Sequence, residues 1–180
     1  PFGLQGEDVR LMVRDFQKRK GLLKGKYEAG RERIIIFSDL HIPEHNEEMV
    51  LDIVSKNSKA SMFILNGDIL DCKAVSSWYD EHISILDYEM IQAHKLLTKI
   101  RNLTNAKIIL IKGNHEQRVN RHYAQNAKAM GTSVVETEIL YKLAKGFTIK
   151  DRITNKRTEY KAIPGVIYCE KRSFLYGDLL

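Results

Sequence analysis

The stretch that decides the fold is Met62-Phe63-Ile64-Leu65-Asn66-Gly67-Asp68, an apolar run that leads into a glycine and an acid. Two other stretches have the same form: Ile34-Ile35-Ile36-Phe37 precedes Asp39-Leu40-His41, and Ile108-Ile109-Leu110-Ile111 precedes Gly113-Asn114-His115-Glu116. Continuous apolar runs of this length are typical of strands buried on both faces, as in a parallel sheet. The polar residues would then lie at neighbouring strand ends, where open α/β sheets bind ligands.

The segments around these runs are predicted to be helices, over residues 46–55, 84–101 and 116–128. The alternation of strands and helices predicts right-handed crossovers, a parallel sheet and an α/β fold. Beyond residue 131 the pattern changes. There, residues 147–153 and 159–168 predict a hairpin.

The chain of 180 residues is long enough for one domain with a substantial core. We divide it into a basic N-terminal helix and linker, residues 1–32, and a main domain, residues 33–180, with the helix expected over residues 6–20. The last residues, 177–180, are largely apolar. Domains rarely end inside what looks like a strand, so we expect a fragment of a longer polypeptide whose C-terminal part is missing.

The composition, 43% hydrophobic and 29% charged, is ordinary for a globular domain. No apolar run approaches the roughly 20 residues that a membrane span requires, so we expect no membrane partner. Two cysteines, Cys72 and Cys169, make no disulfide framework, which favours the cytoplasm. Cys72 follows Asp71 directly, and it is either a buried structural cysteine or a thiol close to a metal.

The net charge of +6 is unevenly distributed, with basic stretches within residues 10–26 and 142–161. A basic surface attracts phosphate-bearing partners. Contact with nucleic acid and a solvated surface without a partner are both compatible with these stretches.

Four residues at the strand ends are candidate metal ligands. Asp39 and His41 are two positions apart, so in an extended segment both side chains would point to one face and bind one cation. Asp68 follows Gly67, where a carboxylate could bridge two metals, and Asn114 follows Gly113 and offers a neutral amide oxygen to the second. Mixed oxygen and nitrogen ligands suit two divalent ions, with Mn²⁺ favoured over Fe, Zn²⁺ or Mg²⁺.

His115 is expected to point toward the substrate as a general acid, held protonated by a hydrogen bond that it donates to Asp71. Asp71 could instead cap a helix. Arg118 and Arg121 could each hold a phosphate oxygen, or form surface ion pairs. His45 either approaches the site or is a loop histidine without a metal role.

These three blocks resemble the calcineurin-like metallophosphoesterase superfamily, phage and bacterial members in particular, whose pattern is D-x-H, G-D-x-x-D, G-N-H-[DE], a lone His and G-H-x-H. The first three blocks match without substitution over residues 33–121. The resemblance implies a two-layer ββ sandwich flanked by helices, two divalent metals and hydrolysis of a phosphate ester. It also implies three further histidine ligands, but this sequence has no G-H-x-H and no histidine beyond His122. We therefore expect the isolated chain to be weakly active or inactive.

The sequence thus predicts a metal-dependent phosphoesterase, a phosphatase, phosphodiesterase or nuclease, in which a metal-bound hydroxide attacks a phosphate mono- or diester. The alternative is a non-catalytic or partner-completed basic module that binds nucleic acid or another subunit.

Overall fold

The structure is a computed structural model that describes residues 33–76, 85–130, 138–151 and 153–169, with side chains left out for residues 126–130. The helix predicted over residues 6–20 and the apolar residues 177–180 lie outside the described residues.

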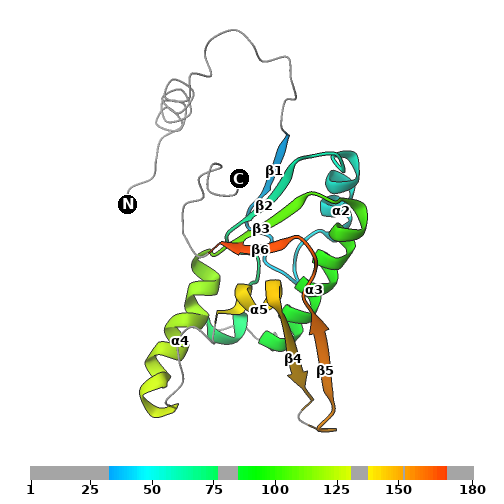
Figure 1. Cartoon of the computed structure of the whole chain (residues 1–180). Coiled ribbons are helices and arrows are strands. Elements are labelled where there is room, and N and C mark those ends of the chain that lie inside the picture. Colours follow the sequence, from blue (N-terminus) through cyan, green and yellow to red (C-terminus); the bar gives the residue numbers. More distant parts are fainter. Residues whose placement is uncertain (1–32, 77–84, 131–137, 152, 170–180) are drawn as a thin grey trace, which may run out of the picture. The chain divides into compact units, whose positions relative to one another are not determined.

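The centre of the molecule is a four-stranded parallel sheet in the order β1-β2-β3-β6 (Figure 1). Its strands are β1 (Ile34–Phe37), β2 (Met62–Asn66), β3 (Lys107–Ile111) and β6 (Val166–Cys169). The first three are the apolar runs that the sequence identified. Because they are parallel and adjacent, the loops after β1, β2 and β3 emerge at one edge of the sheet.

Four α-helices and one turn of 3₁₀ helix accompany the sheet in the described ranges: α2 (Glu47–Lys56), η1 (Lys73–Val75), α3 (Leu86–Leu103), α4 (Asn114–Met130) and α5 (Ile139–Lys145). Three of them match the predicted helices within about two residues, the usual uncertainty of helix ends. The short α5 was not predicted. None of the described helices combines the length and the apolar composition that crossing a membrane would require.

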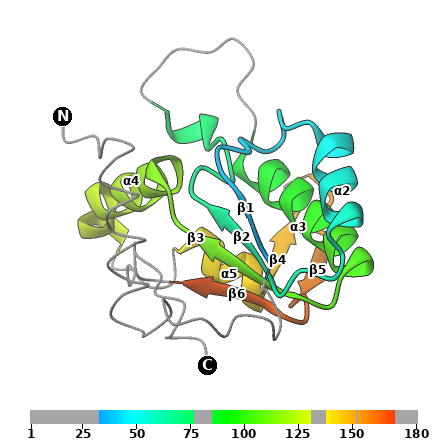
Figure 2. The same ribbon diagram turned by 90° about the horizontal axis from the view of Figure 1, so that it is seen from above.

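The larger core lies between one face of the sheet and the helices, as seen from above in Figure 2. Phe63, Leu65, Ile108 and Leu110 alternate along β2 and β3 toward this side. Helix α3 contributes a complete apolar stripe of Met90, Ala93, Leu96, Leu97 and Ile100. The opposite face carries a second buried cluster of Met62, Ile64, Ile109 and Ile111. Both faces of the central strands are therefore buried, as their continuous apolar runs predict.

The predicted hairpin is present, but its second strand is shorter than the predicted range 159–168. The hairpin pairs β4 (Gly146–Lys150) with β5 (Arg157–Lys161) in antiparallel fashion. Pro164 and Gly165 then end the pairing, and the following residues join the main sheet as β6, parallel to β3. A proline cannot donate to a ladder, which explains the break within the predicted strand 159–168.

The predicted α/β class, with a parallel sheet flanked by helices, is confirmed. Of the sandwich that the resemblance implies, the described residues show the four-stranded sheet, and their second sheet is the two-stranded β4–β5 hairpin.

Candidate metal centre

The three polar blocks form adjoining loops at the carboxyl edge of the sheet. The His41 N–H donates to the Asp68 carbonyl at 2.9 Å, and Ile42 and Leu70 form a parallel bridge. The Gly67 N–H donates to the Ile111 carbonyl at 3.0 Å, which joins the second loop to β3. The sheet pairing thus continues beyond the strands and brings the polar residues together.

Gly113 allows the closest approach in this region. A Cβ atom at this position would lie 2.2 Å from both the backbone nitrogen and the Oδ1 atom of Asp68. The same approach lets the His115 N–H donate to Asp68 Oδ1 at 3.0 Å. Any larger residue at position 113 would push the second and third loops apart.

The Asp39–His41 segment is not extended, contrary to our expectation. Asp39 and His41 have φ angles of 55° and 48°, and Asp68 has 47°. These are left-handed conformations that non-glycine residues seldom adopt and that gather at functional sites. The two side chains are therefore brought into the site by a left-handed turn, because the backbone pairs with the next loop.

Asp68, His41 and His115 form a candidate metal-binding group, in which one ligand atom from each lies within 4.8 Å of the others. The His41 and His115 rings meet edge to face with centroids 4.4 Å apart. Asp68 is 8% exposed, so its charge is mostly removed from water. One carboxylate and two imidazoles are a donor set that a divalent transition ion accepts readily.

Asp68 also lines a cavity of about 280 Å³, together with Asp39 and Asn114. With its nitrogen turned toward Asp68, the Asn114 amide donates to Oδ2 at 2.9 Å and to Oδ1 at 3.2 Å. The structure therefore places His41 close to Asp68, and it places Asp39 and Asn114 with Asp68 in the lining of this cavity. It differs from our expectation in placing His115 among the possible ligands as well.

Asp71 is shared by both histidines. Its Oδ1 lies 3.3 Å from the Nδ1 atoms of His41 and of His115. The His115 Nδ1–H donates to the Asp71 carbonyl at 2.7 Å, which orients the ring and leaves Nε2 toward the site. Asp71 is not a helix cap, because Cys72 takes the N-cap position of η1.

The two arginines predicted to bind substrate are placed differently. Arg118 Nη2 donates to His115 Nε2 at 3.0 Å, one turn along α4, so this guanidinium belongs to the site. Arg121 is exposed, and among the described residues it has no ion pair.

A buried carboxylate, to which the sequence analysis gave no role, fixes the loops. Glu116 is fully buried, and its two oxygens accept from the Leu70 N–H at 2.8 Å and from the Gly113 N–H at 2.9 Å. Burial raises the pKa of Glu116, while these two donors oppose that rise. Glu116 thus ties the loop after β2 to the loop after β3.

Glu89 on α3 likewise fixes the backbone at the start of η1. Its carboxylate accepts from the Cys72 N–H at 2.7 Å and from the Lys73 N–H at 3.2 Å. Glu89 could have been noticed in the sequence, because it is an acid on the apolar stripe of a predicted helix. Cys72 itself lies in the main core, where burial raises the pKa of its thiol, so it is a structural residue. Both ring nitrogens of His45 are buried without a hydrogen-bond partner in the described part of the chain.

Residues 32–175 match the family model of the calcineurin-like phosphoesterases. No curated protein and no solved structure matched the chain. The matched range contains the whole described structure and every residue of the candidate centre, so this chain belongs to the calcineurin-like phosphoesterase family.

Proposed function

We propose that this metal-dependent phosphoesterase uses two divalent ions to hydrolyse phosphate mono- or diesters. The observation that carries the proposal is that Asp68 belongs both to the group with the two imidazoles and to the cavity lined by Asp39 and Asn114. A carboxylate in that position can give one oxygen to each of two ions.

The residues present fit such a centre. His41 and Asp68 would hold the first ion together with Asp39, and Asp68 and Asn114 would hold the second. When bound, the ions would neutralise the phosphoryl oxygens and supply an activated water for in-line attack. The mixture of oxygen and nitrogen donors supports Mn²⁺ as the favoured metal.

In the structure Arg118 donates to His115 Nε2, so this nitrogen carries no proton until the guanidinium turns away. Arg118 would turn toward a phosphoryl oxygen when substrate enters. His115 would then take up a proton at Nε2 from solvent and give it to the leaving oxygen, while the Asp71 carbonyl keeps Nδ1 fixed. Arg121 would extend the phosphate contacts from the exposed side of α4.

The test is hydrolysis of an aryl phosphate monoester and an aryl phosphate diester with added Mn²⁺. We expect slow hydrolysis, since the sequence has no G-H-x-H block, and we expect EDTA or Asp68→Asn to abolish it. The matched control is Asp52→Asn, an exposed acid that pairs with Lys56 on α2. Hydrolysis that survives EDTA or Asp68→Asn would refute the proposal.

The second candidate is a partner-completed or non-catalytic module, which the missing histidine blocks favour. It predicts Mn²⁺ binding without hydrolysis. We place either activity in the cytoplasm, because two cysteines make no disulfide framework.

A further inference from the structure

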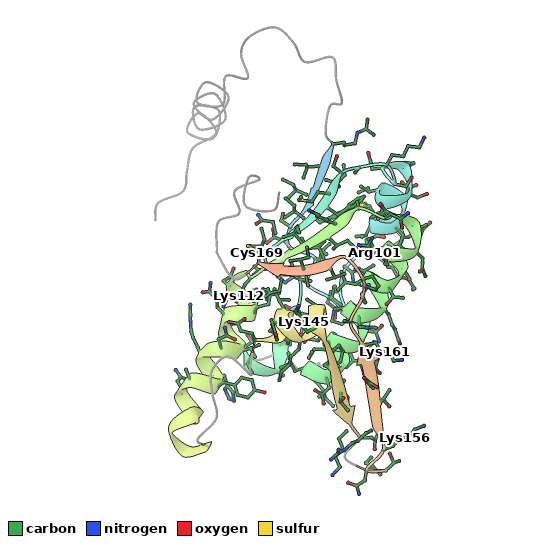
Figure 3. The ribbon with its side chains drawn as sticks, viewed as in Figure 1. Arg101, Lys112, Lys145, Lys156, Lys161 and Cys169 are labelled. Atoms are coloured by element: carbon green, nitrogen blue, oxygen red, sulfur yellow. The ribbon has the colours of Figure 1, made fainter. Side chains whose placement is uncertain are left out.

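The β4–β5 hairpin projects from α3 and α5 as a ribbon of its own, apart from the main sheet (Figure 3). Its described residues include four exposed cations, which we call the ribbon cations: Lys150, Lys156, Arg157 and Lys161. Figure 3 shows Lys156 at the far end of the ribbon and Lys161 farther up β5.

The two faces of the ribbon differ. Residues directly opposite each other share a face, so Phe147 and Tyr160 lie on one face, while Lys150 and Arg157 lie on the other. The aromatic face is half-buried and the cationic face is exposed. Lysine and arginine are thus presented together on the side of the ribbon that faces water.

The opposed pair Lys150 and Arg157 needs a physical explanation. Like charges directly across a strand pair are destabilising. None of the ribbon cations forms an ion pair with another described residue. The one acid within β4 and β5, Glu159, lies on the same face opposite Thr148, and three ribbon cations of the two strands outnumber it there. A polyanion lying along this face would relieve the repulsion.

Asp151 holds two residues of the ribbon's turn, Ile153 and Thr154, by hydrogen bonds. The Asp151 carboxylate accepts from the Ile153 N–H at 2.9 Å and from the Thr154 hydroxyl at 2.9 Å. This turn leaves the Ile153 side chain 92% exposed at the tip. A large apolar side chain so fully presented to water is suited to contact in a groove.

The base of the ribbon is fixed to α3. Phe147 and Tyr160 stack with ring centroids 4.8 Å apart, and the His94 ring meets both rings edge to face. His94 Nε2–H also donates to the Lys161 carbonyl at 2.9 Å. The cations are therefore carried on a preorganised support, which reduces the entropy lost on binding.

We propose that the ribbon binds duplex DNA, with the ribbon cations on the phosphates and Ile153 in a groove. The major groove of B-form DNA admits a two-stranded ribbon, whereas that of A-form RNA is too narrow. A single strand would need exposed rings for stacking, but the rings of the ribbon face α3. This surface is separate from the metal centre and does not depend on the proposed hydrolysis.

The test is fluorescence anisotropy with a labelled 20-base-pair duplex in EDTA, so that metal binding and cleavage play no part. Four phosphate contacts predict a slope of log K against log salt of about −3.6. Lys150→Gln with Arg157→Gln should reduce it to about −1.8 and weaken binding on the order of 10- to 100-fold near 0.1 M salt. Ile153→Ser should weaken binding without changing the slope, because the contact that it removes is apolar.

The matched control is Lys59→Gln with Lys95→Gln, which removes the same charge from exposed positions outside the ribbon. We expect it to bind like the unaltered chain, and we expect all variants to hydrolyse aryl phosphates alike. Equal losses in the control and ribbon variants would overturn the proposal. Absence of duplex binding, or tighter binding to a single strand, an RNA duplex or anionic vesicles, would also overturn it.

Discussion

Asp68 makes contacts with residues from each of the neighbouring loops, and its surroundings depend on a few individual side chains. Its backbone carbonyl accepts from His41, its carboxylate accepts from His115, and Gly113 lies against it. Glu116 ties the loop that carries Asp68 to the loop after β3. Three substitutions separate the roles of packing, loop fixation and chemistry.

Gly113→Ala tests packing. The new Cβ would overlap the Asp68 backbone, which a flexible side chain cannot relieve by moving away. We expect a loss of stability of about 1–3 kcal/mol and weaker Mn²⁺ binding. Urea unfolding and calorimetric titration measure the two effects, and values like those of the unaltered chain would contradict this view of the loops.

Glu116→Gln tests loop fixation. The amide keeps one acceptor oxygen but places an NH₂ group against one of the two backbone N–H donors. Loss of that bond should cost about 1–3 kcal/mol and weaken Mn²⁺ binding. Urea unfolding supplies the measurement. The control is Glu48→Gln, an exposed acid on α2, for which we expect little change.

His115→Asn tests the chemistry. A general acid contributes roughly 10²–10⁴-fold to turnover, so we expect such a drop in kcat with Mn²⁺ affinity nearly unchanged. His122→Asn, an exposed position on α4, is the control. A parallel fall of affinity and activity would make His115 a ligand, as its closeness to His41 and Asp68 allows.

Strands and helices could be predicted from the sequence wherever a segment's own apolar pattern shows which of its faces are buried. The runs in β1, β2 and β3 and the stripe of α3 are of this kind. Residues 159–168 could not be divided correctly in this way. Their last part forms β6, whose direction depends on pairing with β3, and β3 is far away in sequence. The seven residues of α5 are too few for a clear periodicity.

The same distinction applies to the candidate centre. Asp39, His41, Asp68 and Asn114 could be identified because each follows an apolar run. Glu116 and Glu89 were missed, since three of the four backbone N–H groups that they bind lie 16 to 46 positions away, and only Gly113 is near Glu116 in sequence. The number of these N–H groups and the direction in which they point depend on how the loops fold together, which a local sequence pattern does not show.

The turn of the ribbon gives a pH prediction. Hydrogen bonds from Thr154 and Ile153 lower the pKa of Asp151. Its support of the turn is therefore complete above the ordinary aspartate pKa of about 3.9 and is lost as the pH falls through the lowered value. Carboxyl NMR titration should show this low midpoint, and Thr154→Ala should move it back toward the ordinary value. An unchanged midpoint in Thr154→Ala would refute the role of the threonine.

At the level of the entire chain, metal binding and folding should be linked. The candidate ligands come from three loops that meet only when β1, β2 and β3 pair. An ion that binds the folded state stabilises it by about 2.7 kcal/mol at a hundredfold excess over Kd. Thermal unfolding should therefore shift upward with Mn²⁺, and Asp68→Asn should remove most of the shift. An equal shift in the variant would place the ion elsewhere.

Helix α3 also limits where the chain can gain or lose a residue. Glu89 holds the loop at Cys72, and His94 holds the ribbon, five positions further along the same helix. These anchors are about 140° apart around the axis, and inserting or deleting one residue between them would rotate one by about 100° relative to the other. Both could not then reach their partners. We expect length variation to be excluded from residues 89–94 and tolerated at the exposed turn near Thr154, where an added residue moves neither Glu89 nor His94.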